Sequence, residues 1–100
     1  MKVLVLALVG AAFALPAHAD DALAKKHNCF ACHQPDKKVV GPAYKDVAKK
    51  YKGQANAAAQ LEQKVKKGSQ GVWGPVPMPP NPAVPDGDIK KLVDWILKLG

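Results

Sequence analysis

The sequence predicts an all-α fold in which about four short helices form one small domain. Apolar residues recur three and four positions apart in several segments, and no segment alternates apolar and polar residues as a half-buried strand would. Setting aside residues 1–19 of the 100 leaves 81, which suits a single domain with a modest core. Domains of this size often need a metal or another staple for stability. A bound cofactor would supply such a staple.

Residues 1–19 have the layout of a secretory signal peptide. Lys2 is followed by an apolar run from Val3 to Leu15, and the segment ends in Ala17-His18-Ala19, an A-x-A cleavage pattern. We expect cleavage after Ala19 and a mature domain over residues 20–100 in the periplasm. The alternative is an uncleaved anchor, although the run is shorter than the roughly 20 apolar residues of a spanning helix.

The charge of the chain is strongly positive, and lysine supplies all of it. The formal net charge is +7, and without Lys2 the mature chain has 14 lysines against eight acidic residues. Nucleic-acid recognition favours arginine, and the chain has no nucleic-acid-binding motif. Lysines spread over helices form a solvated surface, which also speeds encounter with acidic partners.

Residues 20–28 are expected to form a first short helix, with acids in its first turn and lysines in its last. It leads into Cys29-Phe30-Ala31-Cys32-His33, the Cys-x-x-Cys-His pattern of c-type haem attachment. Cys29 and Cys32 can each bond one vinyl group of the porphyrin, and His33 then lies beneath the iron as an axial ligand. His27 precedes both cysteines, so we interpret it as a surface residue.

Three other roles for the cysteine pair are a disulfide, a thioredoxin-like redox pair and half of a zinc site. A zinc site needs four ligands, and the usual second ligand pair is missing. A thioredoxin motif belongs in a βαβ unit, which needs β-branched runs that the mature chain lacks. Haem attachment is therefore the favoured interpretation.

A second helix is expected over about residues 43–52, with Pro42 pre-organised for its start. The Pro42 carbonyl is also a candidate acceptor for the ring N–H of a metal-bound histidine, which usually has such a partner. The apolar stripe of this helix, expected to pack in the core, comprises Tyr44, Val47, Ala48 and Tyr51.

Gly53 ends that helix, and a third is expected over residues 54–67, closed by Gly68. Its apolar side consists of Ala58, Leu61 and Val65. Glu62 and Lys66 are spaced to form an i,i+4 ion pair on the polar side.

Residues 68–82 are too rich in glycine and proline for a helix, and they contain Met78, the only methionine of the mature chain. Without the haem motif, such a segment would be a disordered linker or a polyproline ligand. Prolines on both sides force an extended backbone at Met78, and a stiff loop can hold a thioether against iron at little entropic cost. Met78 is therefore the predicted second axial ligand.

The last helix opens at residues 85–88, with Pro85 at its first position or Asp86 as its cap. Its buried stripe should consist of Ile89, Leu92, Val93 and Ile96, widened by Trp95 and Leu99.

The mature chain resembles a small bacterial class I cytochrome c of the c-551/c-552 (cytochrome c8) type. The resemblance is carried by residues 29–33, 40–47 and 68–80. It implies a compact fold of about four helices around one covalent haem c, with the first and last helices crossing. It also implies His33 and Met78 as axial ligands, and Pro42 as the acceptor of the His33 N–H.

Two further residues come from the resemblance alone. Trp73 would lie near a haem propionate as a donor, and Asn81 would approach the Met78 sulfur. Lys64 stands where some relatives have Arg or His near a propionate, and Pro82 and Pro85 stiffen the linker after Met78.

The expected function is a soluble, monomeric periplasmic carrier of one electron, and not an enzyme. The resemblance suggests a bc1-type complex as donor and nitrite reductase or a terminal oxidase as acceptor, met through acidic docking surfaces. The alternative is a haem enzyme or gas sensor in which Met78 is displaced by a small ligand. A structural or peptide-binding module would carry no covalent haem.

Overall fold

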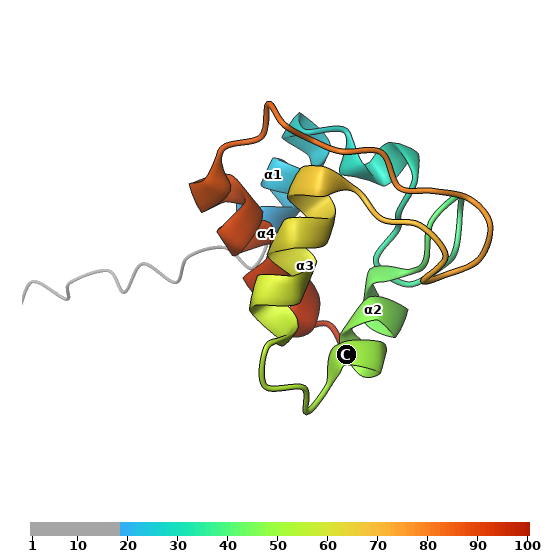
Figure 1. The fold of residues 1–100 in the computed structure, drawn as a ribbon. Coiled ribbons are helices and arrows are strands. Elements are labelled where there is room, and N and C mark those ends of the chain that lie inside the picture. Colours follow the sequence, from blue (N-terminus) through green and yellow to red (C-terminus); the bar gives the residue numbers. More distant parts are fainter. Residues whose placement is uncertain (1–18) are drawn as a thin grey trace, which may run out of the picture.

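The computed structural model describes residues 19–100, so nearly all of the expected leader, residues 1–19, lies outside the described residues. The helices are α1 (Ala19–Lys26), the short 3-10 helix η1 (Cys29–Ala31), α2 (Tyr44–Tyr51), α3 (Ala57–Lys67) and α4 (Asp86–Leu97) (Figure 1). Over residues 19–100 the only extended pairings are two isolated antiparallel bridges, His33 with Lys38 and Ser69 with Met78. The predicted all-α class is confirmed.

Helix α4 is the centre of the fold, since α1, α2 and α3 all pack against it (Figure 1). The predicted stripe of α4 is buried, and Val93 at its centre is completely inaccessible to solvent. Trp95 and Leu99 pack against the same core, as predicted. Both predicted starts of this helix are wrong by one residue, since Pro85 is the N-cap and Asp86 is the first helical residue.

Helix α2 buries the four residues predicted for its apolar stripe. It begins later than predicted, at Tyr44, with Ala43 as its N-cap in an extended conformation. Pro42 therefore lies before the cap and does not start the helix. Its carbonyl serves the histidine described below instead.

Helix α3 begins at Ala57, three residues later than predicted. Gly53 adopts a φ of 80°, and the Gln54 side chain donates to the Lys50 carbonyl, so these residues make the turn out of α2. The predicted Glu62–Lys66 ion pair is wrong. The Lys66 ammonium lies 2.7 Å from the Asp86 carboxylate, because the last turn of α3 lies beside the first turn of α4.

His27 is also placed differently from the prediction of a surface residue. Its side chain is only 14% exposed, and Nε2 lies 3.0 Å from the Asp88 carboxylate. Helix α1 is thereby tied to the first turn of α4 immediately before the cysteine pair.

The described residues contain no helix long and apolar enough to cross a membrane.

Candidate haem-binding site

The two cysteines and His33 lie in one tight turn. Asn28 adopts a left-handed conformation with φ 61°, which turns the chain from α1 into η1. The amides of Cys32 and His33 both donate to the Cys29 carbonyl, at 3.2 and 3.0 Å. Both thiols are partly exposed and not joined in a disulfide. The turn thus presents two free thiols and an imidazole from one short segment.

The His33 imidazole is held from two directions. Its Nδ1 lies 2.8 Å from the Pro42 carbonyl oxygen, which can only accept a hydrogen bond. The Tyr44 ring stacks on it with centroids 4.9 Å apart and planes 18° from parallel. Because Nδ1 carries the proton, the lone pair of Nε2 is left for a metal. The predicted Pro42 contact is present.

Gly41 provides the space that the imidazole occupies. A Cβ atom built there would lie 2.6 Å from His33 Cε1, closer than any real contact. The Gly41 amide also donates to the Cys32 carbonyl at 2.7 Å, which fixes the distance between the two segments. Gly41 lies in a motif that carries the family resemblance, but the sequence predicted no role for it. Its position between the haem motif and Pro42 is the sequence feature that could have indicated this role.

An aromatic cluster packs behind this turn. Tyr44 lies 5.6 Å from Trp95 and 6.4 Å from Phe30, measured between ring centroids, and the Tyr44–Trp95 pair is edge-to-face. Burial raises the pKa of the Tyr44 hydroxyl far above its usual value, and the nearby Cys29 thiol adds to the effect. Burial likewise raises the pKa of the Cys29 thiol. Before attachment, both groups are therefore neutral at pH 7.

Met78 lies on the loop after α3, where its backbone forms an isolated antiparallel bridge with Ser69. The Ser69 amide donates to the Met78 carbonyl at 3.1 Å, and the Met78 amide donates to the Ser69 carbonyl at 2.9 Å. Gly68, with φ 80°, permits this approach, since a Cβ there would lie 2.5 Å from the Met78 carbonyl oxygen. The backbone of Met78 is thus fixed, and its side chain is partly buried.

Asn81 caps the C-terminal end of α3. Its backbone amide contacts the carbonyls of Val65 and Lys66, and its side-chain amide donates to the carbonyls of Val65 and Pro79, at 3.0 and 3.3 Å. The structure gives Asn81 this structural role; its approach to the Met78 sulfur stays a prediction.

Trp73 lies between Gly68 and Met78 on the same loop. Its side chain is 39% exposed, and the Lys50 ammonium of α2 lies 5.2 Å from its ring centroid. Lys64 lies in the second half of α3 and is partly exposed. The propionate contacts predicted for Trp73 and considered for Lys64 remain predictions.

The predicted site residues therefore fall into two groups. Cys29, Cys32, His33 and Pro42 form one connected set around η1. Trp73, Met78 and Asn81 lie on the loop after α3, which extends to the same side of α3 as the segment before α2 (Figure 1).

These residues fit a c-type haem. Two unpaired thiols at the right spacing suit thioether bonds, and an imidazole with Nδ1 occupied suits axial ligation. The absence of a side chain at Gly41 leaves room for this ring. Over residues 19–100, no three His, Cys, Asp or Glu side chains gather as a metal site would require, so the zinc alternative finds no support there.

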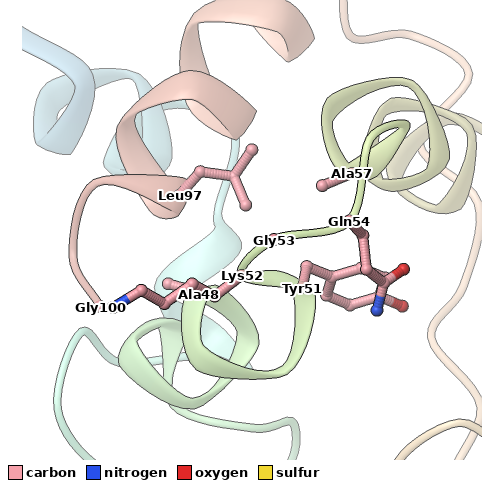
Figure 2. Close-up of a pocket in the computed structure, with 8 residues that line it drawn as sticks. All are labelled: Ala48, Tyr51, Lys52, Gly53, Gln54, Ala57, Leu97 and Gly100. Atoms are coloured by element: carbon pink, nitrogen blue, oxygen red, sulfur yellow. The ribbon is translucent and has the colours of Figure 1, made fainter.

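One pocket lies apart from these residues. It has a volume of about 290 Å³ and lies between the end of α2, the turn at Gly53 and the C-terminal segment, with Leu97 and Gly100 on one wall (Figure 2). None of the predicted haem-site residues lines it.

Comparisons with known proteins agree with this site. Residues 21–100 match the family model described as Cytochrome c. The chain is 60% identical over 83 residues to cytochrome c-552 of Nitrosomonas europaea, covering 83% of this chain and 81% of that protein. It is 58% identical over 77 residues to cytochrome c-551 of Pseudomonas aeruginosa, covering 77% of this chain and 73% of that one.

The fold is similar to a solved structure as well. The crystal structure of wild-type Nitrosomonas europaea cytochrome c552 superposes with a TM-score of 0.78 at 59% identity, covering 80% of this chain and 99% of that one. The matched region contains the Cys-x-x-Cys-His turn. The chain therefore belongs to the cytochrome c family, as a small class I member of the c-551/c-552 (c8) type that carries one covalently bound haem c.

Proposed function

We propose that this haem electron carrier is a periplasmic, monomeric one-electron shuttle whose iron is held between His33 and Met78. Cys29 and Cys32 would hold the haem through thioether bonds, with Pro42, Trp73 and Asn81 supporting it. The observation that carries the proposal is the 2.8 Å contact from His33 Nδ1 to the Pro42 carbonyl. It orients the imidazole and leaves Nε2 for iron.

The residues of the chain have distinct tasks in this proposal. Haem supplies a one-electron Fe(III)/Fe(II) couple. Pro42 holds the proton of His33 on Nδ1, and the Ser69–Met78 bridge fixes the backbone from which the thioether extends. A thioether ligand raises the reduction potential. With His33 and Met78 both bound to the iron, no ligand position would remain for a substrate, which favours a carrier over an enzyme.

The optical spectrum of the ferric protein tests the ligation. Methionine bound to ferric iron gives a weak band at the red edge of the visible range, and we expect it to be stable at neutral pH. The rival function is a haem enzyme or gas sensor with a labile Met78. Ready binding of carbon monoxide by the reduced protein at neutral pH would favour that rival.

The mass of the exported protein tests processing and cofactor together. We expect a chain beginning at Asp20 that carries the added mass of one haem. A mass equal to residues 1–100 plus haem would indicate an uncleaved anchor. A mass equal to the bare polypeptide would contradict covalent attachment.

The partners proposed are a bc1-type complex as donor and nitrite reductase or a terminal oxidase as acceptor. The lysine-rich surface favours acidic docking surfaces on them. Neutralising several exposed lysines should therefore slow electron transfer more at low salt than at high salt. Equal slowing at both salt concentrations would remove the electrostatic part of the proposal.

A further inference from the structure

The loop that carries Trp73 and Met78 has few bonds to the rest of the molecule. Within residues 19–100, no backbone hydrogen bond, side-chain hydrogen bond or ion pair is found for residues 70–77. Gly71 and Gly74 have positive φ, and Pro75 and Pro77 interrupt the segment. The loop is therefore closed at its base by the Ser69–Met78 bridge but free of such bonds along its length.

One contact reaches this loop from a helix. The Lys50 ammonium lies 5.2 Å from the centroid of the Trp73 ring, within the range of a cation–π interaction. Lys50 is exposed and has no ion-pair partner among residues 19–100. Its helix is fixed by the buried side chains of Val47 and Tyr51. A rigid helix thus holds a cation against the aromatic residue of the loop.

We infer that Lys50 is a positioning residue for the haem site: it holds Trp73 and, through Trp73, the loop that presents Met78 to the iron. This inference rests on the proposed role of Met78 as axial ligand. It concerns a side chain outside the ligand set, and it requires a cation at position 50.

The inference predicts how easily an external ligand replaces the thioether. In this inference the loop moves away when the thioether is replaced, so the apparent affinity of the external ligand follows the population of the open state. A cation–π contact at an exposed site limits that population by a factor of about two to five. Lys50→Gln should therefore bind imidazole about two to five times more tightly in the ferric state.

The titration uses holoprotein, imidazole as the probe, and loss of the weak methionine–iron band as the readout. Lys49→Gln is the matched control, because Lys49 is the exposed neighbour on α2 and its loss changes the net charge equally. We expect Lys49→Gln to bind imidazole as the wild type does. Lys50→Arg, which keeps a cation, should also match the wild type.

A second background separates the ring from the charge. In Trp73→Leu, Lys50 has no aromatic face to contact, so adding Lys50→Gln should change imidazole affinity no further. A full effect of Lys50→Gln in that background would overturn the inference, since Lys50 would then act by charge alone. Equal affinities of Lys50→Gln and Lys49→Gln in the wild-type background would overturn it too.

Failure of the proposed ligation would look different. If Met78 is not the axial ligand, the wild-type ferric protein lacks the methionine–iron band before any substitution is made. If the band is present and the lysine variants agree, the ligation stands and the positioning role of Lys50 is refuted.

Discussion

The two proposed axial ligands are presented by segments that are built in different ways. His33 is stacked on a buried tyrosine, hydrogen-bonded through its ring, and surrounded by backbone hydrogen bonds that join residues 32–35 to residues 41–45. Met78 has one backbone bridge at the base of a proline-rich loop. The protein therefore fixes the imidazole through its side chain and the methionine through its backbone. The segment that presents His33 (the histidine side) should keep its structure under perturbation. The loop that presents Met78 (the methionine side) should lose its structure first.

Both segments are fastened at their entrances to the first turn of α4. His27, two residues before Cys29, pairs with Asp88, and Lys66, two residues before Gly68, pairs with Asp86. The first pair is largely buried, with side chains 14% and 23% exposed, whereas Asp86 is 88% exposed. The segment that presents His33 is thus anchored by the more buried ion pair, and the loop that presents Met78 by the more exposed one.

The largest contrast should come from removing each ligand. Met78→Ala should keep the covalent haem and the fold but lower the reduction potential by on the order of 100 mV, out of the roughly 0.8 V that axial ligands span. His33→Ala should also unfold more easily, by about 2 kcal/mol or more, because the Pro42 carbonyl loses its donor and Tyr44 its stacking partner. Voltammetry and denaturant unfolding measure the two effects. An unchanged potential in Met78→Ala would count against Met78 as a ligand.

On the methionine side, Gly68→Ala and Gly53→Ala form a matched pair. Both glycines have a φ of 80°, so alanine costs about 1 kcal/mol or more in backbone strain at either position, and more at Gly68, whose ψ of 176° lies in a region essentially limited to glycine. Only at Gly68 does the new Cβ meet backbone, the Met78 carbonyl at 2.5 Å, whereas nothing lies within 4 Å at Gly53. Gly68→Ala should lose a further 1 to 3 kcal/mol, roughly, and weaken the methionine–iron band. Equal unfolding free energies for the two variants would show that the bridge at Met78 does not need Gly68.

On the histidine side, Gly41→Ala is paired with Gly87→Ala. A Cβ at Gly41 would displace the His33 ring, and we expect a loss of about 1 to 3 kcal/mol in the free energy of unfolding together with a changed potential. Gly87 lies in the first turn of α4 with open space around it, so alanine there should stabilise the protein by up to about 1 kcal/mol. A Gly41→Ala variant as stable as the wild type, with the same potential, would show that the His33 ring does not need the space at Gly41.

The smallest effects should come from the two anchors. Asp88→Asn removes a carboxylate from a largely buried pair and should cost about 1 kcal/mol. Asp86→Asn alters an exposed pair and should cost at most about 0.5 kcal/mol. Urea unfolding at pH 7 and low salt gives both values. The reverse order would mean that the methionine side is the better anchored one.

Helices and attachment chemistry could be predicted from the sequence because their signals are local. The stripes of α2 and α4 follow from residue spacing alone, and the Cys-x-x-Cys-His turn follows from five consecutive residues. The contact between His33 and Pro42 joins residues only nine positions apart, so it could also be predicted from the sequence.

Contacts that depend on how distant segments meet could not be predicted in the same way. Lys66 has a suitable acid one turn earlier, yet it pairs with Asp86 because the helices place that carboxylate nearer. His27 pairs across 61 positions with Asp88, and no local pattern marks either residue. The Lys50–Trp73 contact likewise depends on the path of the loop after α3, which no local sequence pattern predicts.

The central position of α4 has a consequence for biosynthesis. Helix α4, on which α1, α2 and α3 pack, is made after all three of them. Until those residues are available, the earlier helices have no common surface to bury and the core cannot close. Until α4 is made, the cysteine pair therefore lies on a polypeptide whose core is still open to solvent.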